Sequence, residues 1–147
     1  RGSGLQGTEG VSELEPREVA LRAAEAAAEK KASDVIVMNV GPMLVITEYF
    51  VIATGSTDRQ VKAIAEEIED RLRDIGIKPV GREGEREARW VLLDFDEIVV
   101  HVFQPDEREF YRLERLWSDA ERVDLPPEVA NTGGVGQSSA SPAATGS

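Results

Sequence analysis

The chain has 147 residues, 41% of them apolar, which is the size of one domain with additional terminal segments. It carries 28 acidic residues against 17 basic ones, so its formal net charge is −11. A protein that holds nucleic acid mainly through phosphates needs the opposite charge, so this function is disfavoured. A basic protein partner suits such a surface better, and we expect no direct, specific binding of nucleic acid.

Cysteine is absent and histidine occurs once, as His101. The composition therefore excludes disulfides, thiolate zinc sites, iron–sulfur clusters, cysteine nucleophiles and multi-histidine metal sites. No apolar run approaches the roughly 18 residues of a membrane span, and residues 1–16 lack the apolar segment of a secretory signal. We therefore expect a soluble, cytoplasmic protein without a metal or cofactor.

The two ends of the chain differ in composition from the middle. Residues 1–15 contain four glycines and no aromatic residue, and the chain from Pro126 onward consists almost wholly of small and polar residues. Such segments cannot bury enough apolar surface to offset the entropy lost on ordering. The prediction is a single folded domain over 16–123, between disordered segments at 1–15 and 124–147.

The first half of this domain contains one helical and two extended patterns. Residues 16–31 are rich in alanine and other helix formers, with proline in the first turn and two lysines at the end, so they predict a helix with a thin buried stripe. Residues 34–40 and 49–54 are rich in β-branched residues and are separated by Gly41 and Pro42. They predict two strands joined by an irregular loop.

An amphipathic helix follows, with Thr57 and Gln60 as a capping box at its start and Gly76 as its stop signal. We interpret its charged residues as a solvated face. The apolar residues recur every three or four positions: Val61, Ile64, Ala65, Ile68, Leu72 and Ile75.

The second half predicts a short extended piece at 78–84 and two strong strands at 89–95 and 97–103 joined by a tight hairpin. A last helix begins at Pro105, with an apolar stripe of Phe110, Leu113, Leu116 and Trp117. The order of elements predicts an α+β (mixed α/β) fold, with a mixed five-stranded sheet packed by helices.

Two short motifs each allow a binding role or a purely structural one. Gly55 and Ser56 lie between a strand and a helix, where backbone amides favour an anion, but no phosphate-binding glycine pattern surrounds them, so a turn and a helix cap are favoured. Asp94 and Asp96, with Glu97 beside them, could hold a divalent cation. A hairpin rich in aspartate because aspartate suits turns is the favoured account.

The strand 89–95 is apolar on both faces, since Trp90 and Leu92 share one face with Asp94 while Val91 and Leu93 lie on the other. Either helices cover both faces, or one face meets a partner. Residues 94–109 contain six acidic residues and one basic residue, so a partner here would be basic. His101 is either a general base or pH switch, or a hydrogen-bonded structural residue, and the structural role is favoured.

Two long blocks, YFVIATGSTDRQVKAIAEEIED and GEREARWVLLDFDEIVVHVFQPDEREFYRLERLW, closely resemble the ribosomal silencing factor family, related to the plant Iojap protein. The resemblance covers about residues 18–120. It implies a nucleotidyltransferase-like fold without the catalytic acids. It also implies a translational repressor, not an enzyme, that binds the large ribosomal subunit at ribosomal protein L-fourteen. Binding there blocks joining of the small subunit when nutrients are short, as in stationary phase.

Carried over residue by residue, the resemblance assigns contact with ribosomal protein L-fourteen to Trp90, Leu92, Asp94, His101 and Tyr111. Glu48 is a mild departure, because many relatives carry aspartate there. Two alternatives stay open: a metal-dependent nucleotidyltransferase, and a homodimer that uses the face of Trp90 on itself.

Overall fold

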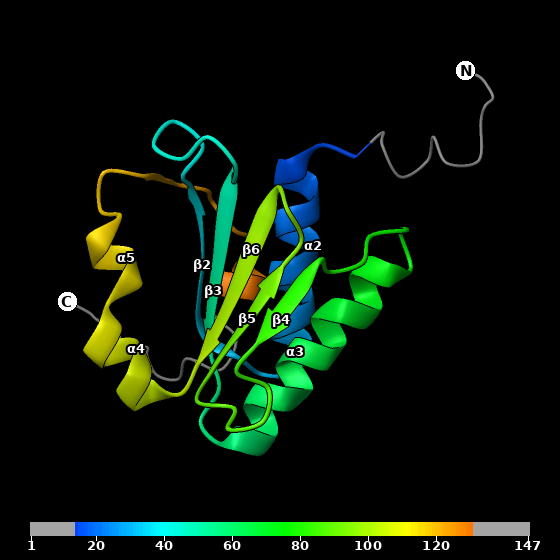
Figure 1. Ribbon diagram of the computed structural model, residues 1–147, viewed down its shortest axis with the longest axis vertical. Helices are drawn as coiled ribbons and strands as arrows, with labels where there is room; N and C mark the ends of the chain where they lie inside the picture. Colours follow the sequence, from blue (N-terminus) through cyan, green and yellow to red (C-terminus); the bar gives the residue numbers. More distant parts are fainter. Residues whose placement is uncertain (1–13, 131–147) are drawn as a thin grey trace.

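The structure, a computed structural model, describes residues 14–130 as a single mixed sheet with helices on both sides (Figure 1). The helices are α2 (Pro16–Glu29), α3 (Asp58–Arg73), α4 (Pro105–Tyr111), α5 (Leu113–Leu116) and α6 (Pro127–Ala130). The strands are β2 (Ser33–Asn39), β3 (Tyr49–Thr54), β4 (Gly81–Glu83), β5 (Trp90–Asp94), β6 (Ile98–Phe103) and β7 (Glu121–Arg122). The predicted mixed α+β class is therefore confirmed.

The strands of the sheet lie in the order β4-β5-β6-β3-β2-β7. β3 and β6 pair in parallel at the centre, and the other neighbours are antiparallel. The prediction of five strands is wrong, because the sheet has six. The missed strand is β7, in which Glu121 and Arg122 pair with the end of β2. Two charged residues at a sheet edge leave no alternating pattern from which a strand could be predicted.

One face of the sheet is covered by α2 and α3, which lie together on one side in Figure 1. The predicted alanine stripe of α2 is fully buried, and small side chains there let the helix lie close to its neighbours. The apolar stripe of α3, from Val61 to Leu72, packs into the same core as Val91 and Leu93 of β5. This layer is the larger part of the hydrophobic core.

The opposite face of the sheet is only partly covered. Its core is centred on Phe50, Ile52 and Phe103, and α4 and α5 lie over part of it (Figure 1). Leu113 and Trp117 pack against this second cluster. The centre of this face therefore has a cover of its own, while the side of β5 stays partly open.

The predicted last helix is broken in two. Arg112 adopts a left-handed conformation with φ of 46°, so α4 ends and α5 begins around it. Arg108 joins the two pieces to the sheet: its Nε donates to the carboxylate of Glu114 at 3.1 and 3.2 Å, and its Nη1 donates to Thr54 Oγ1 at 2.7 Å. A helical spacing of apolar residues does not reveal such a break, because the spacing continues across Arg112.

The predicted cap and stop residues of α3 are confirmed, but the capping box is only half formed, because the side chain of Gln60 accepts the backbone N–H of Ser56 and not that of Thr57. Thr57 caps its first turn by accepting the backbone N–H of Gln60 at 3.0 Å, and Gly76 has a φ of 84°, which glycine adopts without strain. The interpretation of every charged residue of α3 as solvated is wrong at Glu69. This side chain is buried and forms a two-pronged ion pair with Arg82 of β4, at 2.7 and 3.0 Å.

The described structure runs past the predicted end of the domain at 123. Val123 and Val129 are both buried in the core that α2 helps to form, and Val129 is only 2% exposed. Residues 124–130, which the sequence assigned to a disordered tail, therefore lie within the described structure, where Leu125 packs against the same core as the two valines. The expectations for residues 1–13 and 131–147 lie outside the described residues. Within 14–130, no helix is long and apolar enough to cross a membrane.

Replacing Val129 by alanine tests whether this last turn belongs to the folded domain. We expect Val129→Ala to lower the free energy of unfolding by about 1–3 kcal/mol, because buried methyl groups are lost and a cavity remains. Urea unfolding of the full chain measures the change. Asp124→Ala, at an exposed position of the same segment, is the matched control and should leave stability within about 0.5 kcal/mol. Identical unfolding of Val129→Ala and the parent would contradict the packing of α6.

Candidate functional site

The hairpin of β5 and β6 determines which side chains reach the partly open face. The predicted tight turn is present, and Trp90, Leu92 and Asp94 pair with Phe103, His101 and Val99. Strand residues alternate between faces, so Val91 and Leu93 are buried under the helices, whereas Trp90, Leu92 and Asp94 are half-buried on the other side. We call the surface of Trp90, Leu92, Asp94 and Tyr111 the Trp90 face.

The geometry of Trp90 is compatible with both roles that the sequence left open, in the core and at an interface. Its ring stacks on Phe103, with centroids 4.9 Å apart and planes inclined by 27°, and contacts the ring of Tyr111 at 4.7 Å. Tyr111 is itself 49% exposed, and Phe103 is fully buried. The indole is thus held from below by a core residue and flanked by an exposed aromatic. Such a half-buried aromatic pair can contribute to the fold and also meet another protein.

His101 lies beneath the Trp90 face and not on it, since it is only 4% exposed. Its Nδ1 accepts a hydrogen bond from the Trp90 indole Nε1 at 3.2 Å, and its ring meets Phe50 edge to face at 4.8 Å. An indole N–H can only donate, so Nδ1 is unprotonated and the proton of the neutral ring is on Nε2. Nε2 is buried without a partner among the described residues. The hydrogen-bonded structural role, favoured from the sequence, agrees with this geometry.

The pKa of His101 is lowered from 6.5 to about 4, because burial disfavours the charged ring. The rings that contact it, those of Phe50, Trp90 and Phe103, carry no charge that could offset this effect. His101 is therefore neutral at physiological pH, and within residues 14–130 no carboxylate orients it as a general base requires.

Asp94 serves the turn of the hairpin. Its Oδ1 accepts the backbone N–H of Asp96 at 2.8 Å, and Asp96 has a φ of 79°, a conformation that aspartate tolerates better than most residues. Among residues 14–130, no group of three or more histidine or acidic side chains could hold a metal ion. The geometry agrees with the explanation of these aspartates as turn residues.

Gly55 and Ser56 also have structural roles. A Cβ on Gly55 would lie 3.0 Å from the backbone nitrogen of Val61, so glycine allows α3 to start close against the strand. The amide of Ser56 donates to Gln60 Oε1 at 2.7 Å, and the Gln60 amide is capped by Thr57. Since side chains of the chain itself bind these two amides, the turn-and-cap interpretation is supported over an anion site.

Two residues of the apolar stripe predicted for the last helix are exposed. Phe110 is 78% exposed, with its ring against that of Tyr111 at 5.0 Å, and Leu116 is 74% exposed. The break at Arg112 separates Phe110 from Leu113 and Trp117, which do pack on the sheet. The spacing of apolar residues in the sequence does not distinguish those that pack on the sheet from those that stay exposed. Phe110 therefore extends the exposed aromatic surface of Tyr111.

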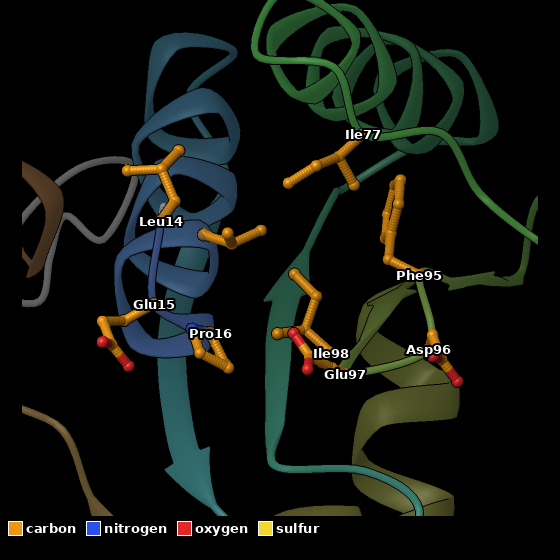
Figure 2. A pocket seen from close by; sticks show the side chains of 9 residues that line it. Leu14, Glu15, Pro16, Ile77, Phe95, Asp96, Glu97 and Ile98 are labelled. Carbon is orange, nitrogen blue, oxygen red and sulfur yellow. The ribbon is translucent and has the colours of Figure 1, made fainter. Parts of the chain in front are cut away.

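A hollow of about 370 Å³ lies elsewhere on the surface, between the start of α2 and the β5–β6 turn (Figure 2). Figure 2 shows its apolar side chains lining the gap, with carboxylates at the margin. The labelled residues include Leu14, Ile77, Phe95, Ile98, Glu15 and Asp96. None of the residues of the Trp90 face lines it, so the hollow and that face are separate features of the surface.

The lowered pKa of His101 predicts how stability depends on pH. Well above pH 6.5 the ring of His101 is neutral in both folded and unfolded states, and it adds no pH dependence to stability. As the pH falls from 6.5 to 4, the unfolded chain takes up a proton that the folded protein refuses, so stability falls by up to about 3 kcal/mol.

His101→Phe keeps an aromatic ring at this position and removes the group that titrates. We expect its free energy of unfolding to fall less steeply between pH 6.5 and 4 than that of the parent, in urea titrations at matched pH values. Parallel curves for the two proteins over this range would contradict the lowered pKa.

Comparison with known proteins places this fold in a family. The sequence matches the family described as ribosomal silencing factor during starvation over residues 13–146. It is 46% identical over 103 residues to the ribosomal silencing factor of Bacillus subtilis, a match that spans 70% of this chain and 87% of that protein. A crystal structure of a protein from Chromobacterium violaceum superposes with a TM-score of 0.70 at 33% identity, over 76% of this chain and 92% of that one.

More distant relatives come from eukaryotes. The chain is 36% identical over 112 residues to the chloroplastic protein Iojap of Arabidopsis thaliana, a match that covers 74% of this chain and 45% of that protein. It is 31% identical over 93 residues to a mouse protein named mitochondrial assembly of ribosomal large subunit protein 1, over 61% of this chain and 41% of the mouse protein. The predicted relationship is confirmed: this chain belongs to the ribosomal silencing factor family.

Proposed function

We propose that this protein is a translational repressor, and not an enzyme, that acts on the large ribosomal subunit in the cytoplasm. It binds ribosomal protein L-fourteen through the Trp90 face and occupies the place where the small subunit would join, when nutrients are limiting and in stationary phase. Family membership supports a ribosome-associated silencing role. The name of the mouse relative, which refers to assembly of the large ribosomal subunit, supports the choice of subunit.

The observation that carries the choice of surface is the half-exposed aromatic pair of Trp90 and Tyr111. Protein interfaces are enriched in such aromatic residues, and a few of them supply most of the binding free energy. His101 contributes from beneath, and Leu92 and Asp94 extend the face along β5.

The acidic side chains around the β5–β6 turn and the start of α4 support a basic protein as the partner. Asp94, Asp96, Glu97 and Asp106 form no ion pair within residues 14–130, so their charges are available to an incoming protein. Complementary charge speeds the encounter with a basic ribosomal protein and opposes binding to bare ribosomal RNA. Repression by occlusion requires affinity alone: with free protein at about a hundred times its dissociation constant, the bound subunit is favoured by about 2.7 kcal/mol.

Replacing Trp90 by alanine tests the anchor. We expect Trp90→Ala to weaken binding to large subunits by about thirtyfold or more, because truncation of a buried interface anchor costs about 2 kcal/mol or more. Since Trp90 is half-buried, stability should fall by less than the roughly 3–5 kcal/mol of a fully buried aromatic. Sedimentation with purified large subunits and thermal melting of the same sample measure the two effects. Normal binding by the folded variant would place the ribosome contact elsewhere.

Reversing the charge of Asp94 tests the electrostatic part of the proposal. Asp94→Lys should weaken binding and change its dependence on added salt, because a cation then faces a basic partner. Glu66→Lys is the matched control, since it makes the same change of net charge at an exposed position of α3, on the other side of the sheet. Equal effects of the two variants would show that only net charge matters.

Two alternatives are decided by separate measurements. A metal-dependent nucleotidyltransferase would release pyrophosphate from a nucleoside triphosphate with magnesium, and we expect none. Release that disappears when Asp94 and Asp96 are both changed to asparagine would instead support the enzyme. A homodimer closed through the Trp90 face would be detected by light scattering, and it would dissociate when large subunits compete for that face.

A further inference from the structure

We propose that His101 is a positioning residue for Trp90: it accepts the indole N–H and so holds the ring in the orientation in which a protein partner meets it. The inference rests on the proposed function, because it concerns how the same face is prepared for binding. In this proposal His101 does not touch the partner itself, because its side chain is only 4% exposed.

Trp90 is restrained from two directions. Its ring plane lies on Phe103, and its only side-chain hydrogen bond within the described residues joins Nε1 to His101 Nδ1 at 3.2 Å. Stacking restrains the indole through its faces but specifies no contact for its Nε1 edge. A directional hydrogen bond at that edge favours the side-chain torsions in which Nε1 points at His101, so the two restraints together select one orientation.

His101 is a rigid support for this bond. It lies near the middle of β6, between β5 and β3, and its ring is packed against those of Phe50 and Phe103. Its neutral ring keeps Nδ1 free to accept, and protonation would destroy the acceptor. With a pKa of about 4, the ring stays neutral at any physiological pH.

The unpartnered Nε2 of His101 distinguishes a role in positioning Trp90 from a role in core packing alone. A buried donor without a partner costs stability, and a phenylalanine at this position would keep an aromatic ring without that unpaired donor. The one side-chain hydrogen bond that the ring does make within the described residues is with Trp90. A polar ring in this apolar layer is therefore explained by the Trp90 hydrogen bond and not by core packing.

Holding the indole in place prepares the face for binding. A partner that meets a fixed aromatic loses less conformational entropy than one that must immobilise it. Loss of the hydrogen bond should therefore weaken binding by about three- to tenfold, with Trp90 itself still present. This is a smaller effect than the removal of the whole side chain.

The test uses two substitutions in the full chain. His101→Phe keeps an aromatic ring and removes the acceptor, whereas His101→Asn supplies an amide oxygen close to the position of Nδ1. We expect His101→Phe to weaken binding to purified large subunits by about three- to tenfold and His101→Asn to restore part of the loss. In a Trp90→Phe background, which has no N–H to hold, His101→Phe should have no further effect on affinity.

A second readout requires no partner. The chain has two tryptophans, Trp90 and Trp117, so nuclear magnetic resonance can follow both indole N–H groups at once. In His101→Phe the Trp90 N–H should exchange with deuterium oxide at least about tenfold faster than in the parent, while the Trp117 N–H serves as internal control and keeps its rate.

Unchanged exchange of the Trp90 N–H in His101→Phe would overturn the positioning role, whether or not the parent binds subunits. So would an equal loss of affinity on adding His101→Phe to the parent and to Trp90→Phe, because His101 would then act through general packing. Absence of binding by the unmodified protein would overturn the proposed function alone, and the exchange measurement would still decide the role of His101.

Discussion

The antiparallel pairing of β5 with β6 is the interaction on which both faces of this protein depend. Its register places Val91 and Leu93 in the core under α2 and α3, and places Trp90 and Leu92 on the opposite side. Because side chains alternate along a strand, a shift of one residue would exchange the two sets and expose the core. The tight turn, closed by Asp94, prevents that shift, so the residue that ends β5 stabilises the register on which the surface depends.

The partly open face follows from how the helices are distributed. Both long helices lie on one side of the sheet, and the short pair α4 and α5 lies over the other (Figure 1). The partly buried ion pair of Arg108 with Glu114 and its bond to Thr54 hold this pair in place, so Leu113 and Trp117 cover the centre of the sheet. Among the described residues, this cover reaches β5 only through Tyr111, at Trp90, which leaves an aromatic surface supported from beneath by core residues.

Sequence reasoning succeeded where local chemistry determines structure. The capped start of α3 and its glycine stop were predicted from Thr57 and Gly76, and the β5–β6 hairpin from two strand patterns that follow each other almost directly, since neighbouring residues determine these features. It failed where distant residues decide. The edge strand β7, the burial of Glu69 against Arg82 and the anchoring of Val129 each depend on a partner elsewhere along the chain.

For the candidate site, the sequence by itself determined the residue types: an aromatic, acid-flanked strand with one histidine nearby, in blocks similar to a known family. Only the tertiary structure decided their roles. It placed His101 below the surface in a hydrogen bond to Trp90, and it left Tyr111 and Phe110 exposed by breaking the last helix. The physical reason is that alternation along a strand assigns a residue to a face, whereas burial depends on which other elements of the fold cover that face.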